Sequence, residues 1–252
     1  MIDAMRHAAG MLAAMAVAVV SFPAHAQPQS CPAPLDKARR LVLVTAKAMN
    51  ELSAEMRLYE RASPAEPWRA ASEPEPANLG RGGMAWSHFF RRYAKPGEPL
   101  KVEGDKRAPA GIYRIGRSFG ILPSSRPGYL RVTDDTVCVN EPLSPHYNAI
   151  TSRRLIEPNT SVENMSHALP MYRRGLVVDY PTDGRARAGS CIFMHVWRSP
   201  TSGTAGCVSM PEARVEALQE FASAGAVVAI LPQGAVSRFG SCLPASGESA
   251  AR

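Results

Sequence analysis

Short apolar runs separated by turn residues recur along the chain and predict a protein built mainly from strands. Residues 40–46 (RLVLVTA) are apolar and rich in β-branched side chains, which is typical of a strand. Residues 191–197 (CIFMHVW) are apolar except for one histidine and indicate a buried central strand, on which alternate side chains share a face. Further strands are predicted at residues 111–115, 137–139, 176–178 and 227–231.

Two segments leave more room for interpretation. Residues 55–59 could form a hairpin with residues 40–46, but residues 49–58 could also form a short helix. Prolines and glycines are dense in residues 63–83, which excludes a long helix there and predicts loops between short strands.

One helix is well signalled. Residues 209–212 (SMPE) place a serine three positions before a glutamate and predict a capping box, after which residues 215–222 follow helical spacing. Gly225 should end this helix, and residues 233–252 should form a loop-like tail. The pattern as a whole predicts a mainly β chain with one or two helices, in the α+β class.

The composition is that of an ordinary globular protein, with 252 residues of which 45% are hydrophobic and 20% charged. Near the N-terminus, residues 8–20 form an apolar run that is followed by Ala24-His25-Ala26, a cleavage pattern. The run is shorter than the ~20 residues of a transmembrane helix. We therefore expect residues 1–26 to be a signal peptide and the rest to be exported, with no stable membrane insertion after cleavage.

The formal net charge of +7 favours anionic partners such as a cell-wall polymer. Export argues against nucleic acid as a partner. Arginine doublets stand at residues 153–154 and 173–174. They fit a solvated basic surface as well as a site that binds carboxylate groups.

Five cysteines follow the expected signal peptide, and an odd number predicts at least one free thiol in an exported protein. If Cys207 is free, the other four allow three pairings, of which Cys138–Cys191 with Cys31–Cys242 is favoured. The alternative is that several remain buried, reduced thiols. The sequence has no C-x-x-C or H-x-x-x-H spacing, so we expect no metal site.

The predicted central strand carries His195, and Cys207 follows twelve residues later, just before the predicted helix. The positive end of a helix dipole would favour a thiolate there, and Gly206 would let nearby amides form an oxyanion hole. A core histidine and an inert thiol are the alternative. Trp197 and Arg198 flank His195 and should line the site, although Trp197 could equally serve core packing.

Four blocks of sequence resemble the YkuD-like L,D-transpeptidase catalytic domain. One is residues 189–210, in which a histidine is followed by TAGC (residues 204–207) where that family usually has Ser-His-Gly-Cys. The others are a G-D-x-x-x-P-A-G-x-Y pattern in residues 101–115, VCVNEPLSPHYN in residues 137–148 and GLVVDY in residues 175–180. The resemblance covers residues 95–232. Residues 27–94 are expected to be a strand and loop region continuous with that domain.

The resemblance implies a β-sandwich or barrel-like fold and a periplasmic or otherwise exported protein that acts on peptidoglycan stem peptides. Cys207 would attack a peptide carbonyl, His195 would act as general base and acid, and no metal or organic cofactor would be needed. The oxyanion loop would consist of Thr204, Ala205 and Gly206. The residues expected to bind substrate are Tyr180, Trp197 and Arg198.

The acceptor of the acyl group is left open by the sequence. Transfer to an amine makes a transpeptidase, whereas transfer to water makes an L,D-carboxypeptidase, an amidase or an endopeptidase. A non-catalytic module that binds the cell wall is a further alternative, motivated by the basic charge and by Ala205, which replaces a histidine of the usual motif.

Overall fold

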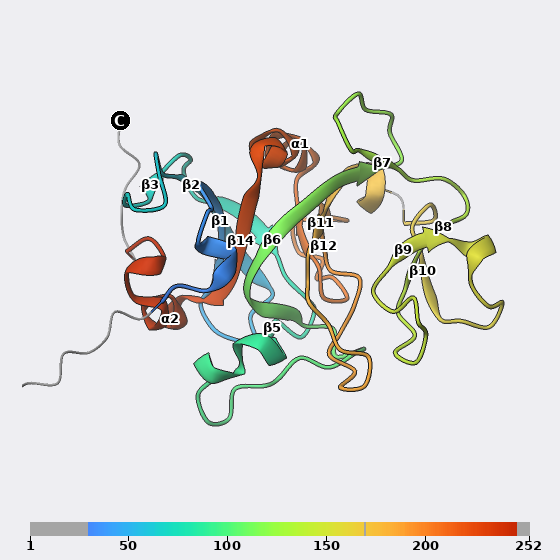
Figure 1. Cartoon of the computed structure of the whole chain (residues 1–252), viewed down its shortest axis with the longest axis horizontal. Coiled ribbons are helices and arrows are strands. Elements are labelled where there is room, and N and C mark those ends of the chain that lie inside the picture. The colour runs from blue at the N-terminus through green and yellow to red at the C-terminus, as the bar shows by residue number, and fades with distance from the viewer. Residues whose placement is uncertain (1–29, 169, 246–252) are drawn as a thin grey trace, which may run out of the picture. The chain divides into compact units, whose positions relative to one another are not determined.

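The computed structural model describes residues 30–168 and 170–245, and the chain divides into the units Met1–Ser30 and Cys31–Arg252. The expected signal peptide lies outside the described residues. The strands of the second unit (Figure 1) are β1 Arg40–Ala46, β2 Ser53–Glu60, β3 Arg69–Ala70, β4 Glu75–Asn78, β5 Met84–Trp86, β6 Ala108–Gly120, β7 Leu130–Arg131, β8 Thr136–Val139, β9 Ile150–Ser152, β10 Val162–Asn164, β11 Gly175–Val178, β12 Phe193–Val196, β13 Val208–Met210 and β14 Ala226–Pro232. The α-helices are α1 Glu212–Phe221 and α2 Gln233–Val236, and the 3-10 helices are η1 Ala33–Leu35, η2 His88–Tyr93, η3 Arg153–Leu155, η4 Met171–Arg173, η5 Ala222–Ala224 and η6 Ser237–Cys242.

The large sheet closes on itself. Its strands follow the order β1, β14, β6, β11, β12, β13, β4 and β2, and β2 pairs again with β1. The β1–β14 and β12–β13 pairs are parallel, and the other neighbours in this ring are antiparallel. This barrel-like arrangement with few short helices confirms the predicted fold class.

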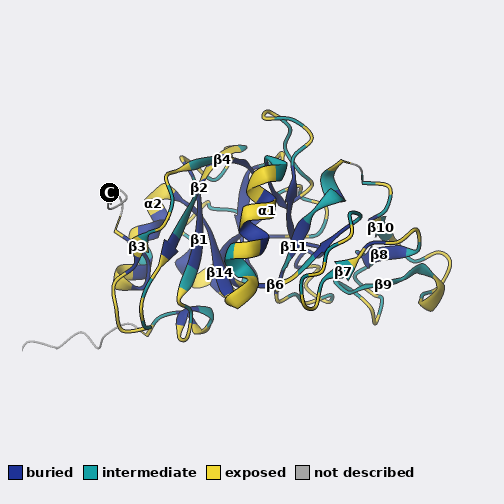
Figure 2. Ribbon diagram, turned by 90° about the horizontal axis from the view of Figure 1, so that it is seen from above, coloured by how far each residue is buried: buried dark blue, intermediate teal, exposed yellow. Residues whose placement is uncertain are grey.

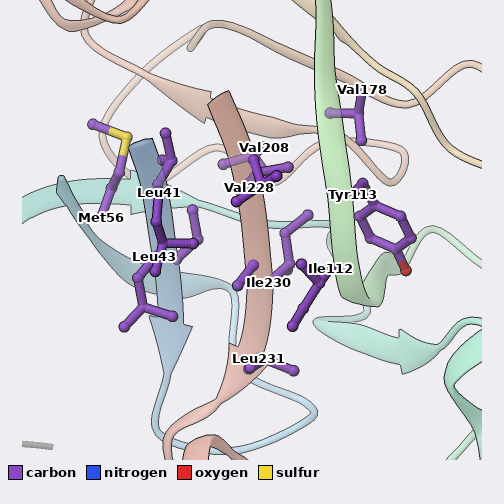
Figure 3. Close-up of a cluster of buried hydrophobic side chains, with 14 of the residues drawn as sticks. Leu41, Leu43, Met56, Ile112, Tyr113, Val178, Val208, Val228, Ile230 and Leu231 are labelled. Atoms are coloured by element: carbon purple, nitrogen blue, oxygen red, sulfur yellow. The ribbon is translucent and has the colours of Figure 1, made fainter. Parts of the chain in front are cut away.

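Strand β14 runs through the centre of the main hydrophobic core. All seven of its residues are buried, between β1 on one side and β6 on the other. A strand covered on both faces has no reason to alternate with polar residues, which explains its continuous apolar sequence. Figure 3 shows Leu41, Val228 and Ile112 from the three strands within this core.

Helix α1 lies against the barrel and packs on β11 and β12. Val215, Leu218 and Gln219 are its buried residues, and the opposite side is exposed (Figure 2). The Gln219 side-chain amide donates to the carbonyl oxygens of Phe119 at 3.2 Å and Gly175 at 2.9 Å. The helix is thereby fastened to the ends of β6 and β11.

The predicted capping box is wrong. Ser209 lies within β13, and the residue before the helix is Pro211, whose side chain makes no capping hydrogen bond. Pairing of β13 with β12 and β4 extends the strand through the predicted cap, so tertiary pairing overrides the local signal. The predicted helix end is confirmed, because Gly225 has a φ of +86° directly after η5.

The strands predicted from the apolar runs are confirmed, and residues 53–60 form strand β2 rather than a helix. The predicted loop-like tail is wrong where the structure describes it, since α2 and η6 occupy residues 233–242. This segment is held by the Cys31–Cys242 disulfide and by the Trp68 indole, which donates to the Cys242 carbonyl at 3.0 Å. No helix in the described part of the chain is both long and apolar enough to cross a membrane.

A separate three-stranded sheet, in the order β10–β8–β9, lies on the β11–β12 side of the barrel (Figure 1). The Cys138–Cys191 disulfide joins β8 to the residues just before β12. Between the two sheets is a second hydrophobic cluster, formed by Phe119, Val132, Cys138, Met165, Tyr172, Cys191, Phe193 and Cys207. The small sheet therefore covers the part of the barrel that carries Cys207.

Candidate active site

Cys207 follows a tight turn and directly precedes β13. Gly206 has a φ of +147°, and a Cβ at this position would lie only 3.1 Å from the carbonyl oxygen of Arg107. Thr204 Oγ1 accepts a hydrogen bond from the Gly206 amide at 3.0 Å and donates one to the Cys207 carbonyl at 2.7 Å. The turn is thus held by its own threonine, and Cys207 is 7% exposed.

The thiol does not lie at a helix N-terminus, contrary to the expectation from the sequence. Strand β13 intervenes, and α1 begins only at Glu212. Val208 pairs in parallel register with Met194 of β12. The sheet register, rather than a helix dipole, therefore sets the position of Cys207.

Two backbone groups, from the start of β12 and the residues just before it, form hydrogen bonds with the sulfur. The Phe193 amide donates to Cys207 Sγ at 3.3 Å, and the thiol donates to the carbonyl oxygen of Cys191 at 3.4 Å. Cys191 is bridged to Cys138, and Cys207 is the free cysteine of this chain. The favoured pairing of the other four cysteines, Cys138–Cys191 with Cys31–Cys242, is confirmed. Cys191 has a φ of +55° and lies outside β12, so the predicted strand begins two residues too early.

His195 lies on β12, two residues beyond the position at which Phe193 contacts the thiol. Its side chain is buried, and Nδ1 lies 2.8 Å from the carbonyl oxygen of Val196. A carbonyl oxygen can only accept, so Nδ1 carries the proton and Nε2 is left with its lone pair. This tautomer suits a general base.

Tyr172 contacts both residues and shows that they share one site. Its ring packs edge-on against the His195 imidazole, with a centroid distance of 5.2 Å. Tyr172 also belongs to the same buried hydrophobic cluster as Cys207, and both residues line one cavity. His195 and Cys207 are therefore brought together around one tyrosine from η4.

Burial keeps both residues uncharged. Burial lowers the pKa of His195 to about 4, and the hydrogen bond to the Val196 carbonyl raises that pKa by a smaller amount. Burial also raises the pKa of the Cys207 thiol, and the negative charge of Glu163 raises it further. The resting site therefore holds a neutral imidazole and a neutral thiol instead of an ion pair.

A cavity of about 540 Å³ opens over these residues. Thr204, Ala205, Gly206 and Arg198 line it together with His195 and Cys207. The remaining lining residues are Leu52, Arg81, Lys101, Glu103, Asn140, Glu163, Met171, Tyr172, Ser190, Cys191, Ile192, Thr201, Ser202, Gly203 and Ser209.

The structure does not bring Tyr180 and Trp197 to this cavity, although both were expected to bind substrate. Tyr180 is 3% exposed, and its phenol donates to the carbonyl oxygen of Ala188 at 2.6 Å. Its ring packs edge-on against Tyr113 in the main core. Trp197 follows the end of β12, and its amide donates to the Met210 carbonyl at 2.9 Å. Tyr180 is thus a core residue, whereas Arg198 does face the cavity.

The arginine doublets are used elsewhere in the fold. Arg173 and Arg174 form ion pairs with Glu212 at the start of α1, and Arg174 also pairs with Glu216. Arg153 donates to backbone carbonyls in the loop before β10. None of these arginines lines the cavity, so their contacts within the fold explain the doublets better than a carboxylate-binding site does.

Four residues near the thiol were missed by the sequence analysis, namely Lys101, Glu103, Tyr172 and Glu163. Lys101 is buried and pairs with Asp105 at 2.7 Å. Glu103 accepts hydrogen bonds from the hydroxyls of Tyr147 and Ser190. Lys101 and Glu103 come from the loop before β6, Tyr172 from η4 and Glu163 from β10, so only the tertiary fold brings them to the thiol.

The described residues contain no group of three or more His, Cys, Asp or Glu side chains that could hold a metal ion. Comparison with known families gives one clear result: the YkuD model, described as an L,D-transpeptidase catalytic domain, matches residues 52–230. No curated protein and no solved structure matches the chain significantly. The match spans most of the barrel strands and includes both His195 and Cys207. The chain therefore belongs to the YkuD family of L,D-transpeptidase catalytic domains, and as such is an L,D-transpeptidase-like enzyme of peptidoglycan.

Proposed function

We propose that this protein transfers acyl groups of peptidoglycan stem peptides through a thioester on Cys207. The observation that carries the proposal is a free thiol that shares one cavity with a histidine whose Nε2 lone pair is available. A thiol and a base in one cavity are the minimal parts of nucleophilic acyl transfer.

In the first half-reaction, His195 Nε2 takes the thiol proton as Cys207 Sγ attacks the carbonyl carbon of the stem peptide. The carbonyl oxygen becomes an oxyanion. The intermediate then collapses with cleavage of the C–N bond, and the imidazolium gives its proton to the leaving nitrogen. Because the Gly206 amide already donates to Thr204, we assign oxyanion stabilisation to the amides of Ala205 and Cys207.

In the second half-reaction, an acceptor attacks the thioester and the sulfur leaves. We propose an amine as the acceptor, which makes the protein a transpeptidase. Arg198 and Arg81 line the same cavity as fixed positive charges and are placed to bind carboxylates of the stem peptide. A water molecule at the acceptor position would give an L,D-carboxypeptidase or an endopeptidase instead.

We also propose that the protein acts outside the cytoplasm, in the periplasm. Two disulfides support this location, because such bonds persist in oxidising compartments. The apolar run and cleavage pattern before Gln27 agree with it.

The test is to incubate purified sacculi with wild-type protein and with Cys207→Ala and His195→Ala, and to analyse the muropeptides by mass spectrometry. Both variants should lose product formation by ~10³-fold or more, because the chemistry needs both groups. His146→Ala is the matched control, since His146 is exposed and outside the cavity. Unchanged products from folded Cys207→Ala would refute the proposal.

A further inference from the structure

Glu163 brings a carboxylate from the small sheet to the thiol. It lies on β10, whose backbone pairs Glu163 with Cys138 of β8, and its side chain lines the cavity. Oε1 accepts a hydrogen bond from the Tyr172 phenol. Tyr172 packs in the same buried cluster as Cys207, and Glu163, Tyr172 and Cys207 all line one cavity, so the carboxylate and the sulfur face the same space.

The second oxygen of this carboxylate is free to bind something else. Oε2 has no hydrogen-bond partner among the residues that the structure describes. Burial raises the pKa of Glu163, with the Tyr172 hydrogen bond opposing that effect. A carboxylate in such an environment is a stronger base than an ordinary glutamate.

An amine acceptor needs such a base. A primary alkylamine like the lysine side chain has a pKa near 10.4, so only about 1 molecule in 2,500 is uncharged at pH 7. The abundant form is an ammonium ion, which has no lone pair and cannot attack a thioester. An acceptor site must therefore bind the cation and then remove its proton.

Resting on the function proposed above, we propose that Glu163 is the acceptor-site residue, which binds the ammonium group of the incoming amine and takes its first proton. Tyr172 is the positioning residue that holds this carboxylate beside Cys207. His195, which serves the thiol, is then needed only for the second proton.

The step balances as follows. The ammonium passes one proton to Glu163 and becomes a neutral amine, whose lone pair attacks the thioester carbon. The new C–N bond forms, the nitrogen loses its second proton to His195, and the C–S bond breaks. His195 returns that proton to the sulfur, and Glu163 releases its own to solvent.

The experiment measures how the acyl-enzyme partitions between two acceptors. Wild type and Glu163→Gln are given a tetrapeptide stem as donor, with either Nα-acetyl-lysine or hydroxylamine as acceptor, and the transfer and hydrolysis products are quantified by mass spectrometry. Nα-acetyl-lysine presents an ammonium ion at pH 7, whereas hydroxylamine is uncharged and needs no such base. Glutamine keeps an oxygen for the Tyr172 hydrogen bond, so the variant should fold.

We expect Glu163→Gln to lower the ratio of transfer to hydrolysis by ~10²-fold with Nα-acetyl-lysine, a size typical of a lost general base, and to leave the ratio with hydroxylamine unchanged. Glu163→Asp should restore part of the loss. Glu157→Gln is the matched control, because Glu157 is an exposed carboxylate in the same small-sheet region but outside the cavity.

Two results would overturn the inference, and they are distinguishable. Suppose that wild type forms an acyl-enzyme on Cys207, but Glu163→Gln changes the transfer-to-hydrolysis ratio equally with Nα-acetyl-lysine and with hydroxylamine, or changes it with neither. Glu163 then has no role in the acceptor site. If wild type forms no acyl-enzyme at all, the proposed function fails and this inference with it.

Discussion

The two disulfides should differ in what they do for activity. Cys138–Cys191 fixes the segment whose carbonyl oxygen accepts a hydrogen bond from the thiol, and it ties the small sheet to the start of β12. Cys31–Cys242 joins the described ends of the chain and lies outside the cavity. We therefore expect loss of the first to impair stability and catalysis, and loss of the second to impair stability alone.

The size of the stability effect follows from the length of chain that each bridge closes. The separation of 53 residues between Cys138 and Cys191 corresponds to ~4 kcal/mol of unfolding free energy in the loop-entropy model. The separation of 211 residues between Cys31 and Cys242 corresponds to ~5 kcal/mol. The bridge that is more important for stability is thus the one that is further from the chemistry.

The assay uses two double variants, Cys138→Ala/Cys191→Ala and Cys31→Ala/Cys242→Ala. Urea unfolding gives the loss of stability, and acyl-enzyme formation is measured at a temperature at which both variants remain folded. The first should acylate at least tenfold more slowly than wild type, and the second should match it, because a misplaced hydrogen-bond partner of the nucleophile costs rate. Equal acylation by both variants would refute the assignment of the Cys191 carbonyl to the site.

Three further outcomes follow from buried polar groups. Since the imidazole of His195 has its pKa lowered to about 4, the rate of acyl-enzyme formation should fall only as the pH drops through about 4, which a pH–rate profile of acylation checks. The unfolding free energy should rise with pH between about 4 and 6.5, where only the unfolded chain binds the proton, and urea titrations check this. The Ser209 hydroxyl is buried without a hydrogen-bond partner in the described structure, so Ser209→Ala should not destabilise the protein and should stabilise it by ~1 kcal/mol in urea unfolding. The hydrogen bond from Arg238 lowers the pKa of Glu98 to about 2; its stabilisation is present above pH 4.5 and lost as the pH falls towards 2, so Glu98→Gln should be destabilising at pH 7 and neutral at pH 2.

The barrel strands could be predicted because their signals are local. Residues 40–46 and 227–231 are continuous apolar runs, and β1 and β14 are central strands whose environment demands such a sequence. The closure of the sheet could not be predicted, since it depends on β1 pairing with both β2 and β14. Strand β14 lies far from β1 in the sequence.

The candidate site was only partly predictable for the same reason. His195 and Cys207 stand in one short segment, so their proximity could be inferred from a strand and a turn. Tyr172 and Glu163 reach the thiol from η4 and β10, and only the tertiary fold brings them there. The prediction that a helix dipole acts on Cys207 was wrong, because Ser209 pairs within strand β13 instead of capping a helix.

That failure changes the chemistry expected of the thiol. A helix N-terminus would have stabilised a thiolate, whereas the observed surroundings of Cys207 raise its pKa and keep it protonated. Disulfide exchange and oxidation both proceed through the thiolate. A neutral thiol is therefore protected in the oxidising compartment that we propose, even though Cys191, to whose carbonyl it donates, is itself half of a disulfide. The thiol proton must then be removed when the substrate carbonyl binds. The group that removes it is the Nε2 lone pair of His195, since no thiolate–imidazolium pair exists beforehand.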